Sequence, residues 1–466
     1  MSEQPRTRQE LYDRLRQSSK QEFILEEMIR LGFWATAEQI AIDPTDEMRR
    51  LGEITRELQQ LRQENARLGN EKKLRQELLK QRLAESKRKQ QETKERRERE
   101  RIEKAQKWQE QKQTGISYLG AEVSGGLNNT ESNAERLSNY GLPRLENAGQ
   151  IAAAMGISVG QLRFLAFSRK TSTICHYIRF TIPKKTGGSR SISAPMPKLK
   201  ESQKWILVNI LNKLELHEAA HGFRRDRSIV SNALPHVKQD VIINFDLKDF
   251  FPSISYRRVK GLFQSLGYSE AAATIFGLLC TELEVEAVEL DGKTYYVANS
   301  DRHLPQGSPA SPAITNLLCR RLDRRLTLMA ENLGFTYTRY ADDLTFSATG
   351  SNLRHICNVL KRTEDIVNHE DLTINQQKTR IIRKSRQQEV TGVVVNSHPN
   401  IARETLKRFR ATLYQIEKDG LEGKHWGNTT DVMAAIQGYA NFVKMVNPAK
   451  GAEFIAQVER IKHKYP

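Results

Sequence analysis

Cysteine is scarce in this sequence, and long hydrophobic runs are missing. The 466 residues include four cysteines, and no two of them form a CxxC pair. This argues against a disulfide scaffold and a cysteine-based zinc module, and it fits a reducing cytoplasm. No apolar run reaches the roughly 18 residues of a transmembrane helix, and the N-terminal MSEQPRTRQELYDRLRQ lacks the apolar segment of a secretory signal. We therefore expect a cytoplasmic protein without membrane contact.

Positive charge predominates. Lysine and arginine number 74 against 56 aspartates and glutamates, so the net charge is +18. Such a surplus points to a polyanionic partner, most simply nucleic acid. A merely soluble basic protein would have the same composition, so only sequence motifs can distinguish it from a nucleic-acid-binding protein.

Residues 1–113 are predicted to form a helical extension. An a/d spacing of a coiled coil runs through Leu51, Ile54, Leu58 and Leu61, and Asn65 takes the next a position. A buried asparagine there commonly fixes the register of two strands, so a homodimer is the first expectation. Beyond Leu83 the charged sequence predicts a solvated helix with i,i+4 pairs, the alternative being a disordered basic arm.

The next segments divide the chain further. Residues 114–135 are rich in Gly, Ser, Asn and Thr, which predicts a flexible linker. In 147–167 we expect two short helices that resemble a helix-turn-helix and serve for packing. From Cys175 on, short apolar runs alternate with helices, which predicts an α+β arrangement. The residues after Arg403 are again helical in pattern.

Two aspartates in TRYADDLTF form the strongest chemical signal. Asp342 and Asp343 lie at the tip of a predicted hairpin between apolar strands, and their mutual repulsion favours a neutralising cation. Asp246 ends the apolar run VIINFDL and could complete an oxygen site for magnesium. Two such ions roughly 3.5–4 Å apart stabilise in-line phosphoryl transfer. The alternative is a solvated Asp-Asp turn and a helix cap.

The surroundings of these aspartates resemble reverse transcriptases. Four motifs occur in the order typical of that family: FDLKDFFPSI at 245–254, PQGSPASP at 305–312, YADD at 340–343 and INQQKT at 374–379. The sequences NALPH at 232–236 and VTG at 390–392 are similar to the NAxxH and VTG motifs of bacterial retron reverse transcriptases. The long extension resembles that of the myxobacterial type.

The resemblance implies a fold and a set of catalytic roles. The fold would be a right-hand polymerase, with fingers and palm over 136–397 and a helical thumb over 398–466. Asp246, Asp342 and Asp343 would hold two Mg²⁺ ions, and Asp249 would be structural. Phe251 would block a ribose 2′-hydroxyl and so favour dNTPs.

It also implies roles for residues around the nucleotide. Lys184 and Arg190 would contact the triphosphate from a mobile hairpin, Arg190 being the preferred ligand. Gln306 and Gly307 would shape the nucleotide pocket, and Lys378 would stabilise the leaving pyrophosphate. The retron motifs contribute further candidate RNA contacts: Asn232, His236, Val390, Thr391 and Gly392.

The implied activity is RNA-directed DNA synthesis on a structured noncoding RNA. Priming from a 2′-hydroxyl of that RNA would leave a branched RNA–DNA product. Retrons of this type usually act in antiphage defence with a separate effector protein. Two rivals stay open: an intron-encoded or abortive-infection reverse transcriptase, and a catalytically idle RNA-binding scaffold.

One further pattern is weighed and rejected. His217-Glu218-Ala219-Ala220-His221 fits HExxH, which binds zinc when it lies on a helix. No third ligand is evident nearby, so we expect no zinc there.

Overall fold

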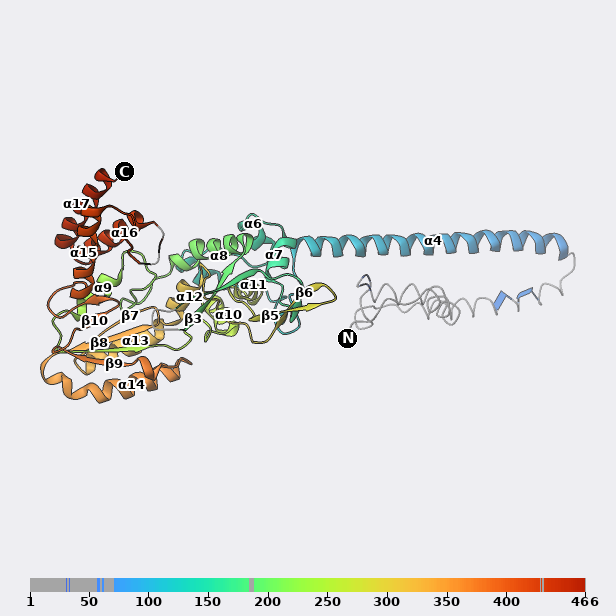
Figure 1. Ribbon diagram of the computed structural model, residues 1–466. Coiled ribbons are helices and arrows are strands. Elements are labelled where there is room, and N and C mark those ends of the chain that lie inside the picture. Colours follow the sequence, from blue (N-terminus) through green and yellow to red (C-terminus); the bar gives the residue numbers. More distant parts are fainter. Residues whose placement is uncertain are drawn as a thin grey trace. The chain divides into compact units, whose positions relative to one another are not determined.

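The computed structural model describes residues 31, 33, 57, 58, 61, 62, 71–183, 188–427, 429 and 431–465. Lys184 and most of the predicted coiled-coil positions from Leu51 to Leu68 lie outside the described residues. The chain divides into two units, Met1–Lys112 and Gln113–Pro466. Figure 1 shows the order of the elements along each unit.

The charged part of the extension forms the single long helix α4 (Glu71–Thr114). The side chains of Arg88 and Glu92 lie 3.4 Å apart, and several other i,i+4 pairs repeat this arrangement. Leu83 and Ile102 are about half exposed, at 53% and 51%. Each exposed pair contributes only ~0.3–0.5 kcal/mol. The prediction of a solvated helix is therefore confirmed, whereas the coiled coil predicted from Leu51 to Leu68 lies mostly outside the described residues and stays a prediction.

The segment 114–135 differs from the expected linker. Ile116, Leu119, Val123 and Leu127 are buried in the first hydrophobic cluster of the second unit. Its glycines and serines form turns, among them a bond from the Ser124 hydroxyl to the Gly120 carbonyl. The segment is therefore packed rather than flexible, because its four apolar residues have a core to enter.

The rest of the first cluster is mostly helical. Two short helices, α6 (Ala148–Ala154) and α7 (Val159–Ala166), bury Ile151 and Leu162 completely, which confirms the packing role expected for 147–167. Ser158 begins α7 with a capping box. The cluster also contains α5 (Ala134–Asn139), α8 (Pro197–Asn209), α10 (Tyr256–Ser265), α11 (Glu270–Cys280) and α12 (Ser311–Leu318).

Two antiparallel elements flank this cluster. The expected hairpin consists of β2 (Tyr177–Pro183) and β3 (Ser189–Pro195), with Pro183 opposite Ser189. A second hairpin, β5 (Val285–Leu290) and β6 (Lys293–Ala298), extends to β1 (Thr171–Ser172) in the order β1-β6-β5.

A four-stranded antiparallel sheet carries the acidic residues. Its order is β7-β8-β4-β9, formed by β7 (Thr336–Tyr340), β8 (Asp343–Ala348), β4 (Val241–Asp246) and β9 (Arg380–Arg383). Val241, Ile243 and Phe245 of β4 enter the second cluster, whereas Ile242 enters the third. This alternation buries both faces of the central strand. Figure 1 shows α13 (Arg320–Asn332) and α14 (Ile356–His369) on one side of the sheet.

The third cluster is built by the C-terminal helices, as the sequence predicts. These are α15 (Arg403–Asp419), α16 (Val432–Val446) and α17 (Pro448–Lys464). The cluster also includes α9 (Ile229–Ala233) and the strands β10 (Glu389–Val390) and β11 (Val393–Val394). Short 3₁₀ turns complete the fold: η1 (Leu211–Lys213), η2 (Leu234–His236), η3 (Gly350–His355) and η4 (Gln376–Lys378).

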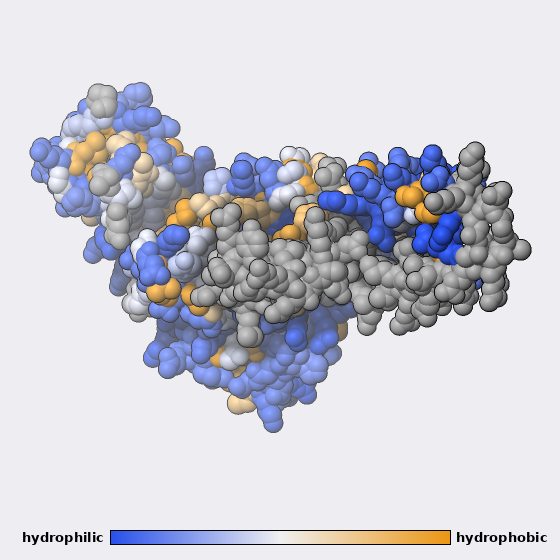
Figure 2. Space-filling view, turned by 90° about the vertical axis from the view of Figure 1, so that its right-hand side faces the viewer, coloured by the Kyte–Doolittle hydropathy of each residue, from blue (hydrophilic) through white to orange (hydrophobic). Residues whose placement is uncertain are grey.

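Hydrophilic side chains predominate on the face drawn in Figure 2, and its hydrophobic residues form small separate patches. Of the helices in the described part of the chain, none is long and apolar enough to cross a membrane.

Candidate active site

Three aspartates meet at one end of the four-stranded sheet. Asp246 ends β4, and its direct partner on the antiparallel neighbour β8 is Asp343. Directly opposite residues project to the same face of a sheet, so these two carboxylates are neighbours. Asp342 precedes Asp343 in the β7–β8 turn, and its carbonyl accepts a 3.0 Å bond from the amide of Leu247. The predicted hairpin and its acidic tip are therefore confirmed.

The electrostatics of this cluster oppose ionisation. Burial, and then the charges of Asp342 and Asp246, raise the pKa of Asp343 to about 7. Burial also raises the pKa of Asp342, with a further contribution from Asp246, while Arg190 and Lys378 act in the opposite direction. Asp342 and Asp343 therefore resist ionisation beside Asp246, and a hard divalent cation would relieve this repulsion.

Lys378 contacts this cluster directly. Its Nζ donates a 2.8 Å hydrogen bond to Oδ1 of Asp246, and the lysine side chain remains 52% exposed. Within the described ranges no three His, Cys, Asp or Glu side chains form a preformed metal centre. Because the lysine occupies one carboxylate oxygen, Asp246 has to exchange that partner before both of its oxygens can bind a cation.

A buried polar network supports the β7–β8 turn, and sequence reasoning missed it. Arg339 is fully buried and makes paired bonds of 2.8 and 2.7 Å to Asp323 on α13. It also donates to the carbonyl of Ala341 and to Asn316, whose own amide donates to the carbonyl of Gly222. The available signal was a charged residue inside the otherwise uncharged strand TYTRY before the aspartates. The network fixes the turn that carries Asp342.

The two adjacent phenylalanines after β4 differ in environment. Phe250 is 4% exposed and belongs to the second cluster, whereas Phe251 is only partly buried and borders both the first and second clusters. Their ring centroids lie 5.6 Å apart. Phe250 therefore packs as a core residue, and Phe251 has a partly open ring five positions after Asp246.

The PQG motif is joined to the β2–β3 hairpin. The carbonyl of Gln306 accepts a 2.8 Å bond from the amide of Ser193 on β3. Gly307 has φ +130°, and a Cβ there would lie 2.8 Å from the Ser193 carbonyl. Glycine is therefore required both by its backbone conformation and by this close approach. Arg190 lies on the same strand, three residues before Ser193.

The NAxxH and VTG motifs contact each other inside the protein. His236 is fully buried and bonds to the hydroxyls of Ser347 and Thr338 at 2.6 and 2.7 Å. Asn232 is also fully buried, and its amide lies 3.4 Å from the hydroxyl of Thr391. Burial lowers the pKa of His236 to about 3, so this histidine is neutral. Both side chains thus join the sheet to the third cluster and are closed to RNA in this structure.

The VTG motif forms a tight turn. Val390 is buried in the third cluster. Thr391 and Gly392 connect β10 to β11 with φ of 47° and 84°. Positive φ at both central positions is typical of a two-residue hairpin turn. Gly392 is exposed and Thr391 is partly buried, so only this turn of the motif faces solvent.

The HExxH sequence does not form a zinc site. Residues 217–221 are not helical. His221 is bonded to Ser231, and Glu218 pairs with Arg224 and Arg227. The rejection of zinc is consistent with these contacts.

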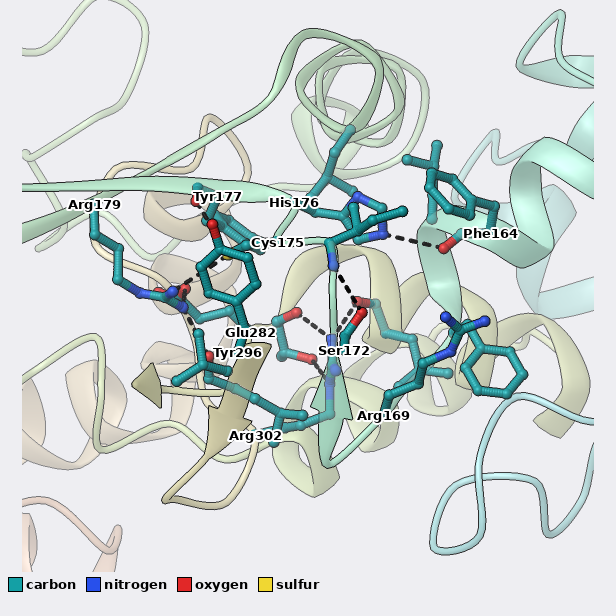
Figure 3. Close-up of a pocket in the computed structure, with 18 residues that line it drawn as sticks. Phe164, Arg169, Ser172, Cys175, His176, Tyr177, Arg179, Glu282, Tyr296 and Arg302 are labelled. Carbon is teal, nitrogen blue, oxygen red and sulfur yellow. Dashed lines mark hydrogen bonds and ion pairs between the residues drawn. The ribbon is translucent and has the colours of Figure 1, made fainter. Parts of the chain in front are cut away.

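A cavity of about 80 Å³ lies at the base of the β2–β3 hairpin (Figure 3), and none of the three aspartates lines it. Arg179 reaches Glu282 at 2.7 Å, and His176 donates to the carbonyl of Phe164 at 3.2 Å. Arg302 bonds to the carbonyls of Leu278 and Thr281. These polar side chains of the cavity are thus already bonded to protein groups, and Arg179 fastens β2 to Glu282, which follows α11.

Comparison with known proteins agrees with this geometry. Residues 182–395 match the family described as reverse transcriptase (RNA-dependent DNA polymerase). The retron Mx162 reverse transcriptase of Myxococcus xanthus is 41% identical over 377 residues, which cover 77% of each chain. The retron Ec86 reverse transcriptase of Escherichia coli is 33% identical over 336 residues, 72% of this chain and 95% of that protein.

Solved structures give a weaker likeness. Telomerase from Candida albicans aligns with 60% of this chain and 56% of its own, at 14% identity and a TM-score of 0.37. A similarity this low supports no conclusion about the chain.

The matched family region spans all three aspartates, and the two retron enzymes align with most of this chain. Reverse transcriptases generally use divalent metal ions, which the carboxylate cluster suits. The chain therefore belongs to the retron reverse transcriptases and is an RNA-directed DNA polymerase.

Proposed function

We propose that Asp246, Asp342 and Asp343 are the catalytic carboxylates and bind two Mg²⁺ ions. The observation that carries this proposal is the direct pairing of Asp246 with Asp343, beside Asp342, at the open end of the sheet. When bound, the ions would activate the primer 3′-hydroxyl and stabilise charge on the transferred phosphate. The raised pKa of Asp343 and Asp342 is the electrostatic sign of a cluster built for cations.

The neighbouring side chains have distinct roles in this proposal. Arg190 binds the triphosphate from β3, and its charge already acts on Asp342. Gln306 and Gly307 form the wall of the nucleotide pocket next to that strand, with Phe251 excluding a 2′-hydroxyl. Lys378 leaves Asp246 when cations bind and then stabilises the departing pyrophosphate. Lys184 remains a second triphosphate ligand on sequence grounds alone.

In this proposal the sheet with α13 and α14 is the palm of a right-hand polymerase. The β2–β3 hairpin and the first cluster form the fingers, within 136–397, and α15 to α17 form the thumb over 398–466. Asn232, His236 and Val390 hold palm and thumb together, while the exposed Thr391-Gly392 turn is the part of these motifs available to RNA.

The decisive experiment is incorporation of labelled dNTPs on an RNA template with an annealed DNA primer. Asp343→Asn should abolish extension. Asp249→Asn is the matched control, because it removes the same charge three residues after Asp246, and asparagine tolerates the positive φ of 46° found at Asp249. Extension by Asp343→Asn at the wild-type rate would contradict the metal-site assignment. Inactivity of the wild-type chain would favour the RNA-binding scaffold.

We further propose that the template is a structured noncoding RNA, primed from one of its own 2′-hydroxyls, and that the branched product serves antiphage defence with a separate effector protein. The membership in the retron family supports this proposal. Nucleic acid purified with the chain should yield DNA that becomes shorter in apparent size after debranching enzyme. Linear DNA alone would favour an intron-encoded or abortive-infection activity.

A further inference from the structure

One aromatic side chain beside the aspartates has no part in the roles assigned above. Phe223 is 57% exposed and has φ +55°. A bulky residue rarely adopts this left-handed conformation, and it persists only where the surroundings enforce it. An exposed apolar ring is not stabilised by burial in the protein core. Burial therefore does not explain why the ring is held there on a strained backbone.

The loop around Phe223 is fastened to the catalytic turn. Gly222 lies so close to the turn that a Cβ there would be 2.6 Å from the amide nitrogen of Ala341. The carbonyl of Gly222 accepts a 2.8 Å bond from buried Asn316. The Phe223 ring lies beside the ring of Tyr340 in a tilted arrangement, with centroids 6.3 Å apart and an interplanar angle of 38°. Phe223 is therefore held next to the YADD motif by the same network that fixes Asp342.

The order of the strands decides which part of the substrate lies there. Asp343 begins β8 and Asp246 ends β4, and these are the two central strands of the sheet. Tyr340 and Phe223 stand at the β7 side, whereas Lys378 stands at the β9 side. In an in-line displacement the attacking oxygen and the leaving group are on opposite sides of the phosphorus. With the pyrophosphate at Lys378, the attacking 3′-hydroxyl comes from the side of Phe223.

We propose that Phe223 packs against the 3′-terminal nucleotide of the primer and so holds the attacking end in place. Aromatic rings bind nucleotides by contact with the base or sugar, without sequence preference. Exposed Arg225, two residues further on, provides a cation for the adjacent backbone phosphate. This inference rests on the proposed carboxylate site, because that site defines the two sides.

The test measures primer–template affinity and nucleotide affinity separately in the full chain. Phe223→Ala should raise the Kd for an RNA template with an annealed DNA primer about tenfold. The KM for dNTP should change less than about twofold, because the ring does not touch the nucleotide. Phe223→Tyr should restore the affinity. Phe164→Ala is the matched control, since Phe164 is 45% exposed and lies outside the site, and it should bind normally.

A second variant separates contact from folding. Phe223→Gly removes the ring and suits the left-handed backbone, so its melting temperature should stay level or rise while primer binding weakens as in Phe223→Ala. Unchanged primer affinity in both variants would overturn the inference, and so would a rise confined to the dNTP KM. If Asp343→Asn is inactive while the Phe223 variants give either of these two contradicting results, the carboxylate site stands and only the role of Phe223 fails.

Discussion

Lys378 donates a 2.8 Å hydrogen bond to Asp246 from 132 residues further along the chain. The pair joins the end of β4 to the turn that precedes β9, so a cation of the protein lies where we propose that a metal ion binds. In the proposed mechanism the two side chains separate when the cations bind.

Replacing Lys378 should therefore change metal binding and turnover in opposite directions. In Lys378→Met, Asp246 loses its competitor, and because exposed pairs contribute at most ~1 kcal/mol, Mn²⁺ affinity should rise up to about fivefold. The rate of dNTP incorporation should drop about a hundredfold, since the leaving group loses its cation. Calorimetric titration with Mn²⁺ and single-turnover kinetics measure the two effects. Weaker metal binding in this variant would contradict the competition.

Asp342→Asn should abolish synthesis without unfolding the chain. The change removes one ligand charge while keeping the side-chain volume, and incorporation should drop more than about a hundredfold. A carboxyl whose folded-state pKa is raised loses stability as pH rises from about 4 towards that value. Without metal, the melting temperature of the variant should therefore equal or exceed that of the wild type at pH 7. A clear loss of stability would point to a structural role instead.

Phe251→Ala should relax sugar selection, because a smaller side chain leaves room for a 2′-hydroxyl. The ratio of rNTP to dNTP incorporation should increase by about tenfold or more, in line with the ~1–3 kcal/mol by which apolar pockets discriminate. The adjacent Phe250→Ala serves as control. Phe250 is buried, so its truncation should cost about 3–5 kcal/mol of stability and leave sugar selection unchanged. An unaltered ratio in Phe251→Ala would place the sugar gate elsewhere.

His236 should make the fold sensitive to acid. Its pKa is lowered by burial to about 3, whereas an unfolded histidine titrates near 6.5. The stability that it contributes is thus complete above pH 6.5 and is lost as pH falls from 6.5 towards 3, by at most about 1.4 kcal/mol per pH unit. Chemical denaturation of the wild type and His236→Gln between pH 7 and 4 should give a steeper loss for the wild type. Parallel curves would refute the assignment.

Removing residues 1–112 should leave primer extension on a generic RNA template largely intact. The cut precedes Ile116 and Leu119, which belong to the core of the second unit, so that core is preserved. If the extension mediates assembly, light scattering should record a lower mass, or a pull-down should lose the effector. If the truncated chain is folded but inactive, the extension takes part in the polymerase reaction. If the mass is unchanged and no partner is lost, the extension has no role in assembly and is a solvated helix.

Sequence by itself determined the elements that depend on neighbouring residues. The β-branched apolar run VIINFDL and the two strands around Ala-Asp-Asp predict β4, β7 and β8, because a short run of strand-forming residues is a local signal. The charge pattern of 84–113 predicts a solvated helix in the same way. The motifs also identify the family, since their residue types and order are legible without coordinates.

Only the tertiary structure decided which distant groups meet. Arg339 and Asp323 form a buried pair that holds the β7–β8 turn, and Lys378 binds Asp246, although nothing local links these positions. The composition of 114–135 predicted a flexible linker, which was wrong. Four apolar residues among the glycines and serines are enough to anchor this segment in the core of the second unit. The motif suggested that Asn232 and His236 contact RNA, whereas the packing of the sheet on the third cluster buries both side chains. Long-range contacts of this kind depend on how whole elements pack, which no local pattern records.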